Sequence, residues 1–293
     1  MNWQKSLKGK VRSGVPLKKY TTFKIGGKAE LFIEPDNTAD LESVVRLLKK
    51  NRLPFFIIGS GSNILVSDKG VKAAVVHLSS PAFRKITFKG NIIEAGSGIN
   101  LKELISKAIG GNLSGIEFLS GIPGTLGGAL AMNAGAAGKK IGDLVLSARV
   151  MDYSGNIRVL SQKKLKFGYR RSSLQKYIIL GASLKLSKSC RSEIRQEIIR
   201  LLNYRRGTQD YVHPSAGCIF KNPAGDSAGR LIDLCGLKAK ISGGAQISKI
   251  HANFIINKSG ATCADVLKLM RLIQAKVKKR FHINLEPEIK IWR

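Results

Sequence analysis

The stretch Ser120-Gly121-Ile122-Pro123-Gly124-Thr125-Leu126-Gly127-Gly128 continues into residues 129–138, which are almost entirely Ala, Gly, Met and Asn. Side chains this small fill little volume, so another backbone or a bound cofactor must pack against this stretch. An earlier loop, Gly59-Ser60-Gly61-Ser62-Asn63, follows an apolar strand expected over residues 54–58. Such a loop exposes successive backbone N–H groups, which can cradle phosphate oxygens. Together the two loops predict a long dinucleotide-type ligand whose pyrophosphate is held by main-chain amides.

Each loop taken alone also fits a plain tight turn. The loop at residues 59–63 is neither a Walker loop nor a Gly-x-Gly-x-x-Gly motif that opens a helix. It therefore gives no support to a Rossmann domain.

The composition is that of a soluble globular protein with one large or two ordinary domains. The chain has 293 residues, 43% of them hydrophobic, and a mean hydropathy of −0.03. No apolar run approaches the roughly 18 residues that a membrane span needs. The first twenty residues are basic but lack the apolar middle of a signal peptide. We therefore expect a cytoplasmic protein with no membrane partner.

The cysteines and histidines give no sign of a metal site. The four cysteines are too far apart for a zinc knuckle or a redox Cys-x-x-Cys motif, and the four histidines are equally scattered. In a reducing cytoplasm the thiols should be free. We expect neither a bound metal nor a disulfide.

The chain is strongly basic, with 50 Lys and Arg against 19 Asp and Glu and a formal net charge of +31. Such a field attracts polyanions, so a nucleic-acid-binding protein is an alternative. The basic residues, however, are spread along the whole length, and aromatic residues make up only 6%. This pattern indicates a general positive charge on solvent-exposed faces and not a dedicated nucleic-acid-binding function. A positive surface charge also favours phosphorylated ligands.

Hydrophobic periodicity predicts mixed strands and helices. Strands are expected over residues 29–34, 54–58 and 73–78, within the strand-rich region 145–186 and over 285–292, and helices over 38–51, 100–109, 194–206 and 262–281. Thr262 and Asp265 approximate a capping box for the last helix. Because strands and helices do not alternate strictly, the pattern predicts an α+β fold instead of a doubly wound parallel sheet.

The segment Pro214–Pro223 carries candidate chemistry. Cys218 is a potential proton donor among small neighbours, and Lys221 and Asn222 offer donors for an anionic, polar ligand. The alternative is a strand that ends in a turn and holds a packed cysteine. The residues of this segment alone do not decide between the two.

Motifs along the chain resemble, in order, those of the UDP-N-acetylmuramate dehydrogenase (UDP-N-acetylenolpyruvoylglucosamine reductase) family of peptidoglycan enzymes. They are Pro54–Val66, Gly121–Gly138, Tyr169-Arg170, Ala216–Pro223, Ala228-Gly229-Arg230-Leu231-Ile232 and Leu285-Glu286-Pro287-Glu288. The resemblance runs from about Thr21 to Trp292, nearly the whole chain. One loop would be weak support, whereas ordered motifs over this length are specific.

The resemblance implies a two-lobed FAD-binding domain of the vanillyl-alcohol-oxidase type over residues 18–187 and a smaller α+β substrate-binding domain over residues 188–293. It leaves open whether the last strand packs back on the first lobe. The chain lacks room for the long substrate-capping insertion of the larger family members. It therefore resembles the shorter subclass, and how the sugar nucleotide is covered stays open.

The resemblance also implies the reaction. NADPH reduces FAD, and a hydride then passes to the enolpyruvyl group of UDP-N-acetylglucosamine enolpyruvate, which gives UDP-N-acetylmuramate for peptidoglycan, and so for cell shape and division. Both substrates use one cleft alternately, so NADPH needs no nucleotide fold of its own. The expected partners are these small molecules, and we expect a monomer.

Arg170, Cys218 and Glu288 are the catalytic residues that the resemblance implies. Hydride addition to the enol ether leaves negative charge on the adjacent carbon and its carboxylate, so catalysis needs a fixed cation or donor and an acid. Arg170 suits bidentate binding of the carboxylate. Glu288 would help most if protonated, and Cys218 stands where the family more often has serine. Glu286 and Glu288 are two residues apart on the expected strand and would share one face, so strand geometry alone does not distinguish them.

The resemblance assigns the remaining site residues to ligand binding. The expected FAD-binding residues are Gly59, Ser60, Gly61, Ser62, Asn63, Ile64, Pro123, Gly124, Thr125, Gly127, Gly128, Asn133, Gly135, Ala136 and Arg230. The expected substrate-binding residues are Tyr169, Arg206, Lys221, Asn222 and His251, with Asn253 in the same matching stretch. Asp210 departs from the proline expected after Gln209, which blurs the shape of that loop.

A different flavin oxidase or dehydrogenase on the same scaffold is a further alternative. The Cys218–Pro223 and Glu286–Glu288 motifs argue against it. Flavin absorbance of the purified protein separates both flavoenzyme hypotheses from the nucleic-acid-binding alternative.

Overall fold

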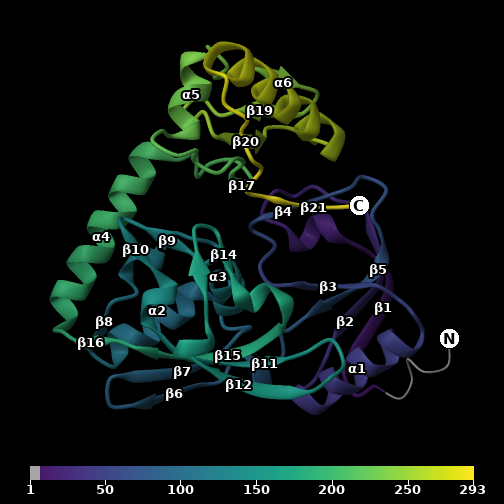
Figure 1. Ribbon diagram of the computed structural model, residues 1–293, viewed down its shortest axis with the longest axis vertical. Coiled ribbons are helices and arrows are strands. Elements are labelled where there is room, and N and C mark those ends of the chain that lie inside the picture. Colours follow the sequence, from purple (N-terminus) through teal and green to yellow (C-terminus); the bar gives the residue numbers. More distant parts are fainter. Residues whose placement is uncertain (1–6) are drawn as a thin grey trace. The chain divides into compact units, whose positions relative to one another are not determined.

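The computed structural model describes residues 7–293 (Figure 1). The chain forms two compact units, each built from separate stretches. Of the described residues, unit 1 contains 7–13, 31–60 and 73–203. Unit 2 contains residues 14–30, 61–72 and 204–293. The boundary near residue 203 falls within helix α4 (Arg191–Thr208). The predicted domain boundary at residue 188 stays a prediction.

The largest sheet of unit 1 has five antiparallel strands in the order β12-β11-β15-β7-β6. They are β12 (Ile157–Ser161), β11 (Val145–Met151), β15 (Ile178–Lys185), β7 (Ile92–Gly96) and β6 (Ile86–Lys89). Helices α2 (Leu101–Gly110) and α3 (Leu126–Met132) pack beside this sheet in Figure 1 and share one apolar core with it. The strand-rich character predicted for residues 145–186 is confirmed.

A second sheet has the order β1-β2-β5-β3. Its strands are β1 (Lys10–Pro16), β2 (Lys28–Glu34), β5 (Val71–His77) and β3 (Phe55–Ile58). Helix α1 (Thr38–Lys50) begins after Asn37, whose Oδ1 accepts a hydrogen bond from Asp40 N at 3.1 Å. Leu41, Val44, Val45 and Leu48 of α1 are fully buried in one core with this sheet, which confirms the helix predicted over residues 38–51.

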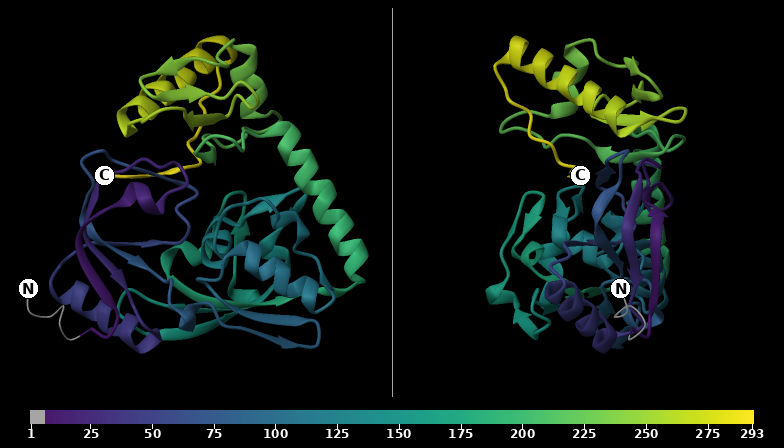
Figure 2. Two further views of the ribbon diagram at one scale, coloured as in Figure 1. Left: turned by 180° about the vertical axis from the view of Figure 1, so that it is seen from behind. Right: turned by 90° about the vertical axis from the view of Figure 1, so that its right-hand side faces the viewer.

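Unit 2 contains an antiparallel sheet of order β17-β20-β19-β18. The strands are β17 (Ser215–Cys218), β20 (Phe254–Asn257), β19 (Ala245–Ile247) and β18 (Ile241–Ser242). Helices α5 (Ala228–Leu234) and α6 (Cys263–Phe281) share a core with this sheet, and Figure 2 shows α6 beside it. The predicted capping box of α6 is present, since Thr262 and Asp265 bond each other's backbone N–H.

Short elements complete the fold. The strands are β4 (Ile64–Val66), β8 (Leu113–Ser114), β9 (Gly135–Ala136), β10 (Lys139–Lys140), β13 (Phe167–Gly168), β14 (Arg171–Ser172), β16 (Ser187–Lys188) and β21 (Lys290–Trp292). The 3₁₀ turns are η2 (Leu17–Tyr20), η3 (Pro81–Phe83), η4 (Glu117–Leu119), η5 (Ile141–Leu144), η6 (Gln162–Lys164) and η7 (Ser173–Lys176). Within residues 7–293 we find no helix long and apolar enough to cross a membrane.

Two sequence-based expectations are wrong in detail. The closing strand predicted over residues 285–292 contains only β21, because Pro287 has no N–H and makes a single bridge, to Phe220. The second glycine loop predicted from Ser120 onward gives way to a helix, α3, at residues 126–132. The low helix propensity of Gly127 and Gly128 hides this short helix, which Thr125 caps.

Candidate functional site

The two predicted glycine loops meet within unit 1. Gly59 lies so close to Thr125 that a Cβ atom on Gly59 would stand 2.4 Å from Thr125 Oγ1. Any larger residue at position 59 must therefore displace this threonine. Ser60, the next residue, is half-buried in the same unit.

The second loop continues as the N-terminus of α3. Thr125 Oγ1 accepts a hydrogen bond from Gly128 N at 3.3 Å. Gly127 N donates to Ser97 O at 2.8 Å, and a Cβ on Gly127 would lie 2.9 Å from Ser97 Cβ. The expected close packing against small residues is thus met, in part, by another backbone. Pro123 is exposed, and Gly124 O accepts from Leu101 N at 2.9 Å.

Two hydroxyls near this loop are buried without a hydrogen-bond partner among residues 7–293. They are Ser97 Oγ and Ser120 Oγ. Buried polar atoms are normally paired, so such atoms are expected beside a polar ligand. Together with the glycine contacts at Gly59 and Gly127, they fit a bound nucleotide cofactor.

The end of α3 connects the second loop to Arg170. Asn133 ends the helix in the left-handed region, with φ 45°. Its Nδ2 donates to Gly168 O at 3.0 Å, and its Oδ1 accepts from Gly142 N at 3.0 Å. Asn133 was predicted to bind FAD, but its amide bonds backbone on both sides. The side chain therefore holds the hairpin that carries Arg170.

Arg170 occupies the two-residue turn between β13 and β14, after Tyr169. Its φ of 54° lies in the left-handed region, which costs a residue with a Cβ about 1 kcal/mol or more. Its guanidinium lies 5.6 Å from the centroid of the Tyr169 ring, and Nη1 donates to Gly135 O at 3.4 Å. Gly135 and Ala136 form β9, so the arginine contacts the predicted FAD-binding segment. Arg171 is exposed.

The rest of the first loop belongs to unit 2. A Cβ on Gly61 would lie 2.1 Å from Tyr20 O, so this position requires glycine. Ser62 is half-buried, and Ile64 begins β4, which pairs in parallel with β21. Asn63 Nδ2 donates to Glu288 O at 3.3 Å, and Asn63 O accepts from Lys290 N at 2.9 Å. The first loop therefore holds the backbone of the predicted catalytic Glu288.

Cys218 follows a bulge in strand β17. The register of β17 against β20 shifts between Ser215 and Cys218, and Gly217 has φ 73° with open space around it. A bulge adds a residue and turns the following side chain, a device often found beside active sites. Cys218 is half-buried. The thiol is therefore not a packed core residue, which favours the functional interpretation.

The residues after Cys218 are bonded along both edges. Glu288 N donates to Ile219 O at 2.8 Å, and Lys221 N donates to Glu286 O at 2.9 Å. On the other edge, Asn253 Oδ1 accepts from Phe220 N at 2.9 Å and Asn253 Nδ2 donates to Phe220 O at 2.8 Å. Unit 2 therefore holds the Cys218 and Glu288 segments as neighbours.

The structure distinguishes the two acidic residues of the closing motif. The Glu286 side chain is 71% exposed and pairs with Lys221 Nζ at 2.5 Å. Glu288 is half-buried. Because Glu288 is the less exposed of the two and its N–H bonds Ile219 O, next to Cys218, it fits the predicted donor role better, and its assignment stays a prediction. Lys221, predicted to bind substrate, makes its ion pair with Glu286.

The other predicted ligand-binding residues of unit 2 lie around α5 and α4. Asn222 Oδ1 accepts from Ala228 N at 3.0 Å at the start of α5. Arg230 is exposed on α5 and pairs with Asp226. Arg206 is exposed on α4. His251 Nδ1 accepts from Asn253 N at 3.2 Å, and burial lowers the pKa of His251, so its ring is neutral near pH 7.

Asp210 forms a buried network where the family resemblance led us to expect proline. Its Oδ1 accepts from the backbone N–H groups of Val212 and His213, each at 3.2 Å, and its Oδ2 accepts from Ser248 Oγ at 3.1 Å. Burial acts to raise the pKa of Asp210, but hydrogen bonds from His213 and Ser248 outweigh it and lower the pKa. No sequence pattern points to Ser248, which is fully buried.

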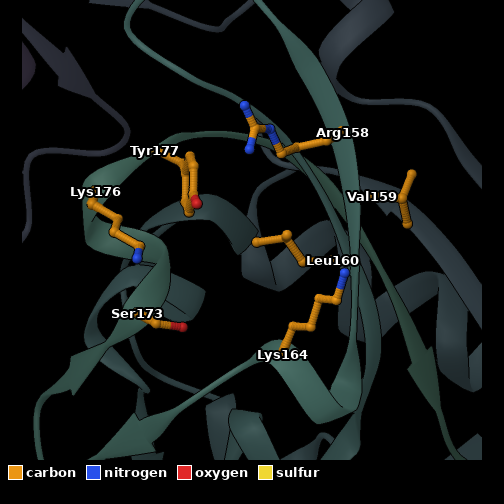
Figure 3. Close-up of a pocket in the computed structure, with 7 residues that line it drawn as sticks. All are labelled: Arg158, Val159, Leu160, Lys164, Ser173, Lys176 and Tyr177. Carbon is orange, nitrogen blue, oxygen red and sulfur yellow. The ribbon is translucent and has the colours of Figure 1, made fainter.

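A separate hollow of about 350 Å³ lies in unit 1 (Figure 3). It is lined by Arg158, Val159, Leu160, Lys164, Ser173, Lys176 and Tyr177. None of these is a predicted site residue, so the hollow does not belong to the candidate site. Within residues 7–293, no group of three or more His, Cys, Asp or Glu side chains is placed to hold a metal ion.

The chain is similar to known proteins along nearly its whole length. Residues 29–161 match the FAD binding domain family, and residues 209–292 match the family described as UDP-N-acetylenolpyruvoylglucosamine reductase, C-terminal domain. A UDP-N-acetylenolpyruvoylglucosamine reductase of Alkaliphilus oremlandii is 45% identical over 94% of this chain and 91% of its own length. The corresponding protein of Caldanaerobacter subterraneus is 43% identical over 97% of this chain and 94% of its own.

A solved structure shows the same likeness. The UDP-N-acetylenolpyruvylglucosamine reductase of Thermus caldophilus superposes with a TM-score of 0.85 and 36% identity, covering 97% of this chain and 100% of its own. The predicted α+β fold, with an FAD-binding domain and a further domain, is confirmed.

The fold and the paired glycine loops define the chain as an FAD-dependent oxidoreductase. Its sequence identity to the two bacterial reductases, over almost the full length of each chain, also shows the family. The chain belongs to the UDP-N-acetylenolpyruvoylglucosamine reductase family.

Proposed function

We propose that the protein reduces UDP-N-acetylglucosamine enolpyruvate to UDP-N-acetylmuramate, with NADPH as the electron donor. The observation that carries this proposal is the hydrogen bond from Glu288 N to Ile219 O, which holds a carboxyl-bearing segment beside the segment that carries Cys218. Reduction of an enol ether requires an acid and a stabiliser of the developing enolate. Family membership supports the substrate.

FAD fits the residues of unit 1. We propose that it is held by the backbone around Gly59, Ser60 and Pro123–Gly128 and by β9. The buried hydroxyls of Ser97 and Ser120 are further polar groups for the cofactor. When bound, the flavin supplies the hydride that it receives from NADPH. We propose that Asn133 contacts FAD through its backbone, because both ends of its side-chain amide bond other backbone groups.

The catalytic roles that we propose follow from side-chain chemistry. Arg170 binds the carboxylate of the enolpyruvyl group, and its contact strengthens as negative charge develops. Glu288, when protonated, donates a hydrogen bond to the developing enolate. Cys218 donates the proton to the carbon that becomes carbanionic. Tyr169 orients Arg170, which its ring already contacts.

The remaining proposals concern substrate binding, oligomeric state and cellular location. Arg206 is a candidate for the substrate diphosphate, and Asn222 and Lys221 for polar groups of the sugar nucleotide. We further propose that the enzyme works as a monomer in the cytoplasm.

Rapid-mixing kinetics on the FAD-loaded protein test the function. NADPH should bleach the flavin absorbance, and UDP-N-acetylglucosamine enolpyruvate should restore it with stoichiometric formation of UDP-N-acetylmuramate. Bleaching without recovery would instead support a flavin dehydrogenase for another substrate. A protein that stays colourless and inactive after FAD is added would overturn the proposal.

A further inference from the structure

We propose that Asn253 is a positioning residue that sets the acid Cys218 and the donor Glu288 through the backbone of Phe220. This inference rests on the proposed function for its kinetic consequence, but its structural part can be tested without turnover. Asn253 is 1% exposed, and its amide contacts the protein backbone instead of solvent. It was expected only as a neighbour of substrate-binding His251.

The Asn253 side-chain amide makes the hydrogen bonds to Phe220 that a neighbouring strand would otherwise make. β17 pairs with β20 up to Cys218, and Ile219 N still donates to the backbone carbonyl of Asn253 at 2.9 Å. One residue further, the side-chain amide takes over and satisfies both the N–H and the C=O of Phe220. An amide can do this because it offers a donor and an acceptor side by side.

The opposite edge of the same segment carries Glu288. Ile219 O accepts from Glu288 N, and Phe220 bridges to Pro287. Phe220 is 1% exposed, so its backbone groups have no access to water if the amide is removed. Because the segment is held between two edges, movement at Phe220 shifts both Cys218, two residues before it, and Glu288, which is bonded to its neighbour.

Strand β20 offers a matched control. Asn257 is also buried, at 9% exposure, and its amide also bonds backbone on both sides, through Nδ2 to Phe23 O at 3.1 Å and through Oδ1 to Ala261 N at 2.9 Å. These partners are not part of the Cys218 or Glu288 segments. Asn257→Ala therefore removes the same kind of contact from the same strand.

The experiment separates the two half-reactions of the FAD-loaded enzyme. In Asn253→Ala, flavin reduction by NADPH should stay within about twofold of wild type, while reoxidation by the enolpyruvyl sugar nucleotide slows about a hundredfold, as expected for misplaced catalytic groups. In Asn257→Ala both rates should stay near wild type at temperatures well below unfolding. Equal slowing in the two variants would overturn the proposal.

A second variant gives a signature that lost stability does not mimic. Asn253→Asp donates to Phe220 O only when its carboxyl group is protonated, and burial raises the pKa of such a group. The reoxidation rate of Asn253→Asp, relative to wild type at each pH, should therefore rise as pH falls. A ratio that is independent of pH would contradict the proposed geometry.

The third readout needs no substrate. Site-resolved mass spectrometry gives the rate at which iodoacetamide alkylates Cys218. Asn253→Ala should change this rate severalfold, and Asn257→Ala should not. An altered alkylation rate with no enolpyruvyl reduction even in wild type would refute the proposed function but support the positioning by Asn253. Unaltered alkylation of Cys218 in Asn253→Ala would overturn the positioning itself.

Discussion

Gly59 and Thr125 lie in direct contact, although 66 positions separate their numbers in the chain, and no side chain larger than hydrogen fits between them. Each belongs to one of the two glycine loops from which the dinucleotide ligand was predicted. Their contact places the two loops together within unit 1, so one cofactor can be held by the backbone of both.

We expect Gly59→Ala to lose FAD. The added methyl group would press on Thr125 Oγ1, the atom that caps α3. We predict at least tenfold weaker FAD binding, measured by fluorescence as flavin is titrated into the apoprotein. The free energy of unfolding should fall by about 1–3 kcal/mol, as for other overpacked sites.

Gly110→Ala is the matched control for this change. A Cβ on Gly110 would meet no atom within 4 Å, and the residue ends α2 in the same unit. This variant should bind FAD like wild type and be at least as stable, since alanine favours helix over glycine. If both variants bound FAD normally, the glycine contact would have no role in cofactor binding.

Replacing Arg170 by glycine should separate stability from activity. Its φ of 54° is a conformation that glycine adopts freely, so Arg170→Gly relieves about 1 kcal/mol of backbone strain. We expect a melting temperature no lower than wild type and at least a hundredfold slower flavin reoxidation by the enolpyruvyl substrate. Arg171→Ala, an exposed neighbour, should keep its activity. A fully active Arg170→Gly enzyme would exclude Arg170 from catalysis.

How far the sequence predicts this fold depends on whether a pattern is local. The helix α6 was predictable because its capping box and the periodicity of its apolar residues are both local. Helix α3 was not, because two glycines near its start mask a helix that the Thr125 cap and packing on Ser97 stabilise. The closing strand was overextended because periodicity does not register that Pro287 cannot donate a ladder hydrogen bond.

The candidate site likewise has features that local sequence patterns predict and features that only the tertiary structure shows. Motifs pointed to Cys218 and Glu288, but no pattern in the sequence shows that their segments are hydrogen-bonded to each other. The preference for Glu288 over Glu286 rests on solvent exposure and on the ion pair of Glu286 with Lys221, which are tertiary facts. Likewise, the Asn133 amide could only be assigned to the backbone once Gly168 and Gly142 were located.

Cys218→Ser should remain active, whereas Cys218→Ala should not. A hydroxyl can replace the thiol as the proton donor, but a methyl group cannot. Loss of a general acid typically costs about a hundredfold or more, which we expect in the flavin reoxidation rate of Cys218→Ala. Iodoacetamide should inactivate wild type but not Cys218→Ser. Full activity of the alanine variant would remove Cys218 from the mechanism.

Cys263 should resist alkylation in the folded protein. Burial, together with the nearby Asp68 carboxylate, raises the pKa of Cys263 to about 11. Near pH 8 only about one molecule in a thousand then carries the reactive thiolate. Exposed Cys190 should react first under native conditions, and both should react in urea. Rapid native labelling of Cys263, read by peptide mass spectrometry, would contradict its burial.

Asp210 should make the protein sensitive to acid. Its pKa is lower in the folded than in the unfolded protein, because hydrogen bonds from His213 and Ser248 outweigh the effect of burial. A lowered folded pKa stabilises the fold above the unfolded value, near 3.8, and this stability is lost as pH falls through the folded pKa. Wild type should thus exceed Asp210→Asn by about 1–2 kcal/mol in unfolding free energy at pH 6.

The difference between wild type and Asp210→Asn should shrink below pH 4, as the carboxylate becomes protonated in both states. Urea unfolding followed by circular dichroism between pH 2.5 and 7 measures it. Asp233→Asn is the control, since Asp233 is 49% exposed and pairs with Lys238 at the surface, where ion pairs contribute little. If the Asp210→Asn difference stayed constant with pH, the Asp210 carboxylate would not be the charged acceptor that its contacts with Val212, His213 and Ser248 imply.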